Sequence, residues 1–290
     1  MSRLEVLATG ALATIQDEGR PGLAALGVGV SGAVDRRSLR LANRLLGNDP
    51  GAAAIEVTFG GLVLRADGDV DIAVTGAECP TTVDGSPVGT HAPVHVRDGA
   101  QVQLSPPSSG VRTYLAVRGG FAVPADLGSR STDLMSGIGP PVLAEGDVLP
   151  VGSPPVHWPG VDVAPVPTPA DGDVDLRVLA GPRDDWFVPD ALATLCSHPY
   201  EVTAESNRVG MRLHGPVLGR SRQEELPSEG VVRGSLQVPT AGQPTLFLAD
   251  HPVTGGYPVI AVVLTEDIDL AGQARPGQRL RFHLRRAERR

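Results

Sequence analysis

The chain has 290 residues, which is enough for one large domain or two ordinary ones. Its 33 acidic and 25 basic residues give a formal net charge of −8, and this acidic balance argues against a nucleic-acid partner. No apolar run approaches the roughly 20 residues that span a bilayer, and the N-terminal segment is too polar for a signal peptide. We therefore expect a soluble, cytoplasmic protein with no membrane partner.

All 25 of these basic residues are arginine, since the chain contains no lysine. This composition excludes a P-loop lysine, a lysine Schiff base, a Ser–Lys nucleophile pair and a lysine that could carry biotin on this chain. The two cysteines, Cys79 and Cys196, lie far apart, and the histidines lack the spacing of metal ligands. We therefore expect no metal site in this chain and no catalytic cysteine.

Short strands dominate the predicted N-terminal part, residues 1–155. Aromatic residues make up only 3 %, while 36 glycines and 27 prolines are spread along the chain, which is typical of strands joined by tight turns. One helix is predicted at 35–46, because apolar residues recur at helical spacing there, with Asp35 as its N-cap. Strands are predicted at residues 4–7, 11–16, 61–65, 70–75, 93–96, 100–104 and 112–117.

Residues 156–172 are dense in proline and small residues, and we interpret them as a linker. The stretch after it, residues 173–290, is predicted to be a second β subdomain. A short helix is expected at 189–195, with Pro189 in its first turn. Strands are predicted there at residues 175–179, 200–205, 246–249, 259–264 and 279–282.

The sequence Gly255-Gly256-Tyr257-Pro258 forms the most distinctive turn of the chain. The glycines allow a ligand or another backbone to approach closely, and Pro258 keeps Tyr257 out of the α region. The alternative is an ordinary glycine-rich hairpin with a packed tyrosine. Polar side chains close to this turn in the sequence could hold a small polar ring: Gln237, Gln243, Asp250 and Thr254.

Two asparagines and an arginine are further candidates. Asn207 offers a donor and an acceptor, and Arg208 offers a planar fork for a carboxylate or phosphate, although an arginine here could equally tie down a loop. Asn43 lies in the middle of the predicted helix, where it either satisfies a buried backbone group or faces a cleft. His251, beside Asp250, is a possible general base.

Several sequence blocks resemble a known family, and they occur in the family's order along nearly the whole chain. These blocks are residues 14–22 (TIQDEGRPG), 27–35 (GVGVSGAVD), 41–48 (LANRLLGN), 114–120 (YLAVRGG), 127–133 (LGSRSTD), 206–213 (SNRVGMRL), 228–232 (SEGVV), 254–258 (TGGYP) and 275–277 (RPG). They resemble the family of the bacterial 5-oxoprolinase C-type subunit, also called allophanate hydrolase subunit 2 or biotin-dependent carboxyltransferase-like proteins.

The resemblance implies a mainly β fold with two cyclophilin-like β-barrel subdomains and a few short helices. It also implies a subunit of an ATP-dependent 5-oxoprolinase, which opens the lactam of 5-oxoproline to L-glutamate, with ATP shared with partner subunits. Under this hypothesis Asp250 and Asn207 are catalytic. The substrate-binding candidates are Arg208, Gln237, Gln243, Thr254, Gly255, Gly256, Tyr257 and Asn43.

Two other functions are compatible with the same resemblance. The chain could be the carboxyltransferase component of a biotin-dependent urea carboxylase or allophanate hydrolase system, with biotin on another chain. It could also be a non-catalytic regulatory partner, because a related sporulation protein antagonises a kinase inhibitor by binding to it. Dependence of activity on biotin separates the first alternative from the 5-oxoprolinase hypothesis.

Overall fold

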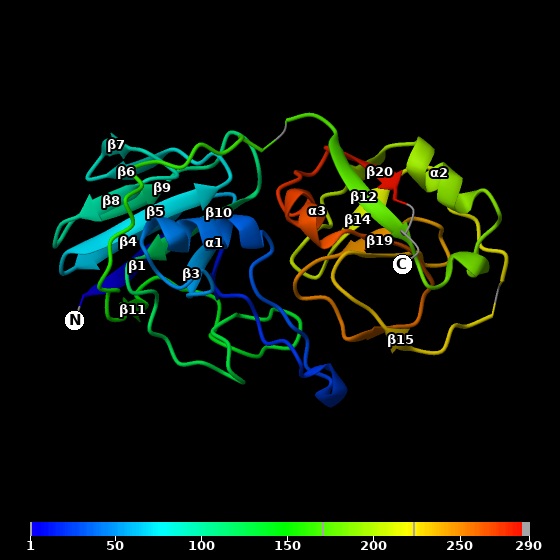
Figure 1. The fold of residues 1–290 in the computed structure, drawn as a ribbon, viewed down its shortest axis with the longest axis horizontal. Helices are drawn as coiled ribbons and strands as arrows, with labels where there is room; N and C mark the ends of the chain where they lie inside the picture. Colours follow the sequence, from blue (N-terminus) through cyan, green and yellow to red (C-terminus); the bar gives the residue numbers. More distant parts are fainter. Residues whose placement is uncertain (1, 170, 223, 286–290) are drawn as a thin grey trace. The chain divides into compact units, whose positions relative to one another are not determined.

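The computed structural model describes residues 2–169, 171–222 and 224–285. Strands dominate these residues, and the α-helices among them are the short α1 (Arg36–Leu45), α2 (Ala191–Ser197) and α3 (Thr265–Ala271) (Figure 1). The mainly β fold class is therefore confirmed. Within the same three ranges no helix is long and apolar enough to cross a membrane.

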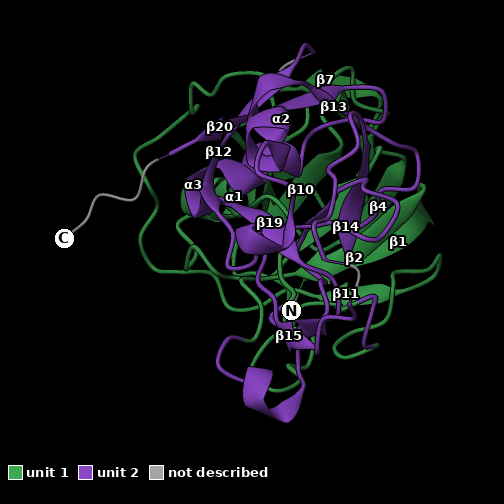
Figure 2. Ribbon diagram, turned by 90° about the vertical axis from the view of Figure 1, so that its right-hand side faces the viewer, with its two compact units in different colours: residues 1–20, 31–133, 137–169 green, residues 21–30, 134–136, 170–290 purple. Residues whose placement is uncertain are grey.

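The chain forms two compact units (Figure 2). The first consists of residues 1–20, 31–133 and 137–169, and the second of residues 21–30, 134–136 and 170–290. Two short segments of the N-terminal part, 21–30 and 134–136, thus belong to the second unit. The predicted division at 155 and 172 into consecutive stretches does not describe this.

In the first unit, the strands form two antiparallel sheets. The larger has the order β11 (Val148–Pro150), β1 (Arg3–Thr9), β4 (Leu62–Asp67), β9 (Gln101–Leu104), β6 (Thr81–Val83) and β7 (Ser86–Val88). The other has the order β2 (Leu12–Gln16), β3 (Ala54–Thr58), β10 (Arg112–Val117), β5 (Val70–Gly76) and β8 (Pro93–Val96). Inward-facing residues of both sheets, such as Leu4, Leu64, Ile55 and Ile72, build one core between them.

Helix α1 packs on the five-stranded sheet, against β5 and β10. The carboxylate of Asp35 accepts a hydrogen bond from the backbone N–H of Ser38 at 3.0 Å, which caps the helix as the sequence predicts. The buried residues Leu39, Ala42 and Leu45 recur on one face and join Tyr114 of β10 in a second apolar cluster. The predicted helix is therefore confirmed to within one residue at each end.

The second unit contains a closed barrel of seven strands. Their order is β12 (Val174–Ala180), β19 (Val259–Val263), β16 (Ser235–Gln237), β17 (Thr245–Phe247), β14 (Gly210–His214), β13 (Tyr200–Val202) and β20 (Arg279–Leu284). The barrel closes through a parallel pairing of β12 with β20, and its other strand pairs are antiparallel. Beside it lies a two-stranded ribbon of β15 (Glu229–Gly230) and β18 (Thr254–Gly255). A closed barrel is thus present in the second unit, whereas the first unit is built as two sheets.

Several element boundaries differ from the sequence-based expectation. The strand expected at 200–205 ends at Val202, and the helix expected at 189–195 begins at Ala191, after Pro189. Strand β3 escapes prediction because Glu56 interrupts its apolar run, although this glutamate is buried and accepts hydrogen bonds from Tyr114 Oη and Val34 N. Strands β6, β7, β11, β14, β15, β16 and β18 are also missed, and most of them have only two or three residues.

The proline-rich segment is attached to the first unit as far as residue 169, and residues 152–169 contain no helix or strand. Arg118 holds its beginning in place: Nη2 donates to the carbonyl oxygen of Pro155 at 2.6 Å and to that of His157 at 3.2 Å. The same guanidinium lies 4.1 Å from the ring centre of Trp158, which is a cation–π contact. Residues 156–169 of the expected linker thus form a segment without helix or strand, and Arg118 anchors its start.

Candidate functional site

Arg208 and Asp250 form a buried ion pair at one end of the barrel. Arg208 lies two residues before β14, Asp250 lies three residues after β17, and the N–H of Asp250 donates to the carbonyl oxygen of Arg208 at 3.0 Å. Their side chains are 1 % and 0 % exposed and share two parallel hydrogen bonds, Nε to Oδ2 and Nη2 to Oδ1, each of 2.9 Å. The backbone N–H of Leu134 also donates to Oδ2, at 3.1 Å. Such a two-bond fork fixes the orientation of the carboxylate.

Asn207 lies beside this pair in the chain, with its side chain exposed. Its Oδ1 accepts hydrogen bonds from the backbone N–H groups of Val209 at 2.8 Å and Gly210 at 3.2 Å, which closes the turn into β14. The Nδ2 group makes no hydrogen bond to the part of the chain that the structure describes. The amide is thus fixed through its oxygen and presents its donors outward.

The turn at Gly255–Tyr257 leaves the two-stranded ribbon through Gly255 of β18. Gln237 of β16 donates from Nε2 to the carbonyl oxygen of Tyr257 at 3.0 Å. A Cβ at Gly255 would lie 2.4 Å from that nitrogen, so the glycine makes room for Gln237. Tyr257 is 45 % exposed, and Thr254 and Gly256 are exposed as well. The side-chain amide of Gln237 thus fixes the turn, and Gly256 and Tyr257 of the turn are exposed to solvent.

Two predicted site residues use their amides elsewhere. Gln243 accepts from the N–H of Gly215 at 2.9 Å and donates to its carbonyl oxygen at 3.0 Å. Asn43 belongs to the first unit, where it donates to the carbonyl oxygen of Ala52 at 2.7 Å and accepts from Asn48 at 3.0 Å. Of the two interpretations of Asn43, the structure therefore shows the one in which it satisfies a buried backbone group.

His251 follows Asp250 and is nearly buried. Its ring stacks on Phe247 with centroids 6.1 Å apart, and Nδ1 lies 2.7 Å from the carbonyl oxygen of Pro252. A carbonyl oxygen only accepts hydrogen bonds, so Nδ1 is the donor in this contact.

A second polar cluster, in the first unit, joins two of the sequence blocks that lie more than 100 residues apart. Asp17 is its centre: Oδ1 accepts from Ser129 Oγ at 2.6 Å and from Ser131 Oγ at 2.5 Å, and Oδ2 accepts from the N–H of Arg130 at 2.6 Å. The hydroxyl groups of the block at 127–133 thus bind a carboxylate of the block at 14–22.

Arg20 belongs to this cluster, although the sequence analysis did not single it out. It is 2 % exposed, and its Nη2 donates to the carbonyl oxygen of Ser131. Its Nε and Nη1 have no hydrogen-bond partner among residues 2–169, 171–222 and 224–285. A buried guanidinium with unpaired nitrogens is costly. The sequence feature that could have indicated Arg20 is its position three residues after Asp17, in the block TIQDEGRPG.

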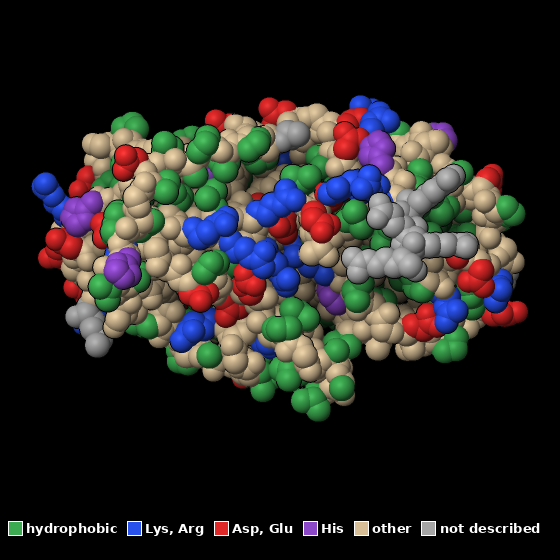
Figure 3. Space-filling model, viewed as in Figure 1, with side chains coloured by type: hydrophobic (Ala, Val, Ile, Leu, Met, Phe, Trp, Pro, Cys, Tyr) green, Lys and Arg blue, Asp and Glu red, His purple; other side chains and the backbone are tan. Residues whose placement is uncertain are grey.

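Charge and thiol chemistry set limits on the site. Burial raises the pKa of Cys79 to about 11 and also raises the pKa of Cys196, so neither thiol is activated as a nucleophile. In the described ranges no group of three or more His, Cys, Asp and Glu side chains could hold a metal ion. Basic side chains gather over α1 (Figure 3), where Arg37, Arg40 and Arg44 are exposed and Arg40 pairs with Glu18 at 2.5 Å.

Comparison with known proteins places this geometry in a family. The family described as carboxyltransferase domain, subdomain A and B, matches residues 26–284. The C-type subunit of the 5-oxoprolinase of Escherichia coli strain K12 is 37 % identical over 282 residues, which cover 96 % of this chain and 90 % of that protein. The urea amidolyase of Lachancea kluyveri is 33 % identical over 306 residues, which cover 96 % of this chain but 17 % of that protein.

Solved structures agree with this assignment. The crystal structure of the K. lactis urea amidolyase superposes with a TM-score of 0.91 at 32 % identity, over 97 % of this chain and 18 % of that one. The crystal structure of TTHA0988 superposes with a TM-score of 0.89 at 37 % identity, over 98 % of this chain and 55 % of that one. The chain therefore spans about half of the TTHA0988 chain and a smaller part of the amidolyases. It belongs to the family of carboxyltransferase domains, subdomains A and B.

Proposed function

We propose that this chain is the C-type subunit of a multi-subunit 5-oxoprolinase, which hydrolyses the lactam of 5-oxoproline to L-glutamate with ATP in the cytoplasm. The observation that carries the proposal is the 37 % identity to a C-type subunit of 5-oxoprolinase across 90 % of that protein's length. A match of this coverage includes the segments that position Asn207, Arg208 and Asp250. The sequence similarity therefore extends over the candidate site as well as the strands that carry it.

A relaxed lactam is a poor electrophile, and its hydrolysis places negative charge on the ring oxygen. Stabilising that charge requires donors that already point at it before the reaction begins. We assign this role to the Nδ2 group of Asn207. Asn207 is held by two hydrogen bonds to its oxygen, which supports its assignment as an oxyanion donor.

Asp250 is better suited to orienting a group than to taking a proton from one. Both of its oxygens accept from Arg208, and Oδ2 accepts from Leu134 as well. The side chain is also 0 % exposed, so its oxygens face these donors and not solvent. We assign Arg208 and Asp250 to holding the loops that carry Asn207 and the 250–257 segment.

The residues of this chain do not fit a complete ATP site. There is no lysine for a P-loop. In the second unit, Arg208 pairs with Asp250, and Arg183 pairs with Glu229. The positive charge near the candidate site is therefore already balanced by carboxylates. We assign nucleotide binding mainly to partner subunits and derive no step through ATP here.

The test is the reconstituted complex of this chain with its partner subunits, assayed for release of glutamate from 5-oxoproline with and without ATP. Loss of one oxyanion donor costs on the order of 100-fold or more in turnover, so we expect Asn207→Ala to lower kcat by about that factor. Gln103→Ala removes an exposed amide of β9 as the matched control and should leave kcat unchanged. Unchanged turnover in Asn207→Ala would exclude this residue from the mechanism.

The second candidate is a carboxyltransferase, and the match to urea amidolyases favours it. The absence of lysine requires biotin to be attached to another chain. An activity that avidin abolishes, with no glutamate released from 5-oxoproline, would establish this function in place of the first. A stable complex whose partners work equally well without this chain would instead indicate a regulatory partner.

A further inference from the structure

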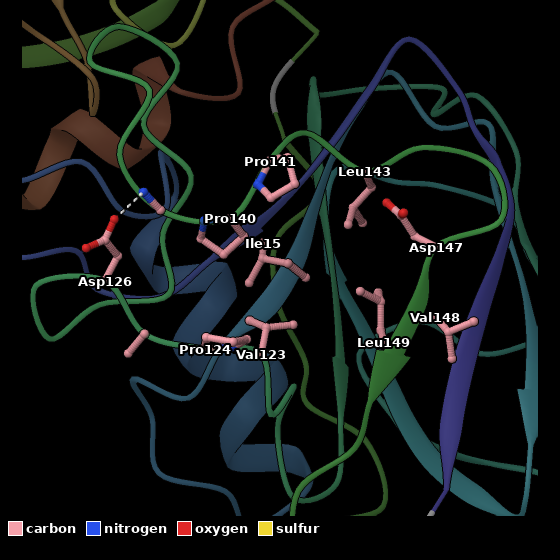
Figure 4. Close-up of a pocket in the computed structure, with 12 residues that line it drawn as sticks. Ile15, Val123, Pro124, Asp126, Pro140, Pro141, Leu143, Asp147, Val148 and Leu149 are labelled. Atoms are coloured by element: carbon pink, nitrogen blue, oxygen red, sulfur yellow. Dashed lines mark hydrogen bonds between the residues drawn. The ribbon is translucent and has the colours of Figure 1, made fainter.

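A cavity of about 520 Å³ lies in the first unit, apart from the residues discussed above as a catalytic site (Figure 4). Its walls come from β2, the segment 123–126, the segment 139–143 and the start of β11. Val123, Leu143 and Leu149 are buried at its apolar surface. Pro124, Pro140 and Pro141 add rigid walls, since proline has a fixed φ. The cavity has the size of a small-molecule site and is largely pre-formed.

The charged groups that line this cavity are two carboxylates, Asp126 and Asp147. Figure 4 shows them on opposite sides of the apolar lining. Each is oriented by one backbone N–H: Gly139 donates to Asp126 Oδ2 at 3.3 Å, and Ala144 donates to Asp147 Oδ2 at 2.8 Å. Neither carboxylate has an arginine or histidine partner within the described ranges. The cavity is therefore apolar in its middle and negative at both sides.

We propose that this cavity binds a linear aliphatic diamine in its doubly protonated form. The methylene chain would lie against the apolar lining, and one ammonium group would meet each carboxylate. A monoamine would satisfy one carboxylate only, and an uncharged ligand would satisfy neither. An anion such as 5-oxoproline would be repelled, so this site is separate from the one proposed for the lactam.

The strength of binding follows from the same features. Asp126 is exposed and Asp147 is half-buried, so each ion pair contributes modestly. We expect a diamine of matching length to bind about fivefold more tightly than the monoamine of equal length. Each further buried methylene adds about fourfold in affinity, until the chain exceeds the separation of the carboxylates.

The experiment titrates the full chain, without partner subunits or nucleotide, by isothermal calorimetry at neutral pH and low salt. The probes are α,ω-diamines of increasing length beginning with putrescine, the monoamines of the same lengths and the corresponding diols. We expect an optimum of affinity at one diamine length and weakening with salt.

The variants Asp126→Asn and Asp147→Asn keep the shape and the oxygen that accepts the backbone N–H. Each should lower diamine affinity about fivefold, to the level of the monoamine, and leave diol binding unchanged. Asp162→Asn removes an exposed carboxylate outside the cavity and should change nothing. Equal affinities for diamine and diol, or diamine binding that both cavity variants leave intact, would overturn the proposal. Because neither partner subunits nor ATP are present, these results are independent of the 5-oxoprolinase assay.

Discussion

At the scale of single residues, the geometry of the Arg208–Asp250 pair shows what its two side chains do. Both side chains are fully buried, and each is the other's bidentate partner. The sequence presented Arg208 either as a ligand contact or as an arginine that ties down a loop. The geometry supports the second role, and through it the placement of Asn207.

Removing one member of this pair leaves a buried charge without its partner. We expect Asp250→Ala to lower the free energy of unfolding by about 3–5 kcal/mol, measured by urea denaturation. In the exposed Arg212–Glu205 pair, the matched change Glu205→Ala should cost no more than about 1 kcal/mol.

A double variant distinguishes stability from function. Replacing both charges, as Arg208→Met with Asp250→Leu, should recover most of the lost stability, because no unpaired charge remains buried. Turnover of the reconstituted complex should stay low, since the loops of the site are no longer held by the fork. A double variant that regains full turnover would contradict the role assigned to this pair.

Because the thiol of Cys79 is buried, its ionisation makes the stability of the folded chain depend on pH. Burial raises its pKa from the ordinary 9.0 to about 11, so the unfolded chain releases this proton first as the pH rises. The folded state therefore loses stability between about pH 9 and pH 11, and below pH 9 this thiol makes no pH-dependent contribution. Urea denaturation across this range should show a smaller decline for Cys79→Ala than for the parent chain, with Gln103→Ala, which removes an exposed side chain that does not titrate, as the control. An identical decline in Cys79→Ala would contradict this assignment.

At the scale of elements, the clamped segment after β11 shows how a single side chain can order a stretch without regular structure. The guanidinium of Arg118 contacts the carbonyl oxygens of Leu46, Pro155 and His157, and it stacks on Trp158. Proline cannot donate from its nitrogen, so the segment has few backbone hydrogen bonds of its own. Arg118 therefore anchors the start of this segment, and farther along the N–H of Ala164 donates to the carbonyl oxygen of His91 at 2.8 Å.

We expect Arg118→Ala to release the segment and expose the peptide bond after Val161, whose side chain is already 43 % exposed. Limited digestion with elastase, followed by mass spectrometry, should show cleavage there several times faster than in the parent chain. Arg97→Ala removes an exposed arginine elsewhere in the first unit and serves as the control. Equal cleavage rates in all three proteins would show that other contacts hold the segment.

The elements also show which signals sequence reasoning can use. Helix α1 was predictable because its apolar spacing and its Asp35 cap agree with each other. Strand β3 was not, because Glu56 is buried by a partner, Tyr114, that lies 58 residues away. Short strands such as β16 are missed for a similar reason. Three residues are too few to show a hydrophobic alternation, and they form a strand only through pairing with their neighbours in the barrel.

At the scale of the whole molecule, ordered motifs predicted more than periodicity did. They indicated the family and the mainly β fold, whereas the assignment of 21–30 and 134–136 to the second unit depends on contacts far apart in the sequence. The candidate site was predicted in part: Asn207, Arg208 and Asp250 are grouped by β14 and β17, while Gln243 and Asn43 satisfy backbone groups elsewhere. Residue type alone does not distinguish an amide that holds a turn from one that meets a ligand.

The parallel pairing of β12 with β20 has a consequence for biosynthesis. Residues 174–178 find their partners at 280–284, more than 100 positions later in the chain. On the ribosome, the barrel interior therefore stays exposed to water until residues 280–284 have been translated. Nascent chains that stall before that point would present Leu176 and Val178 to chaperones, so the second unit should acquire its protease resistance late and in one step.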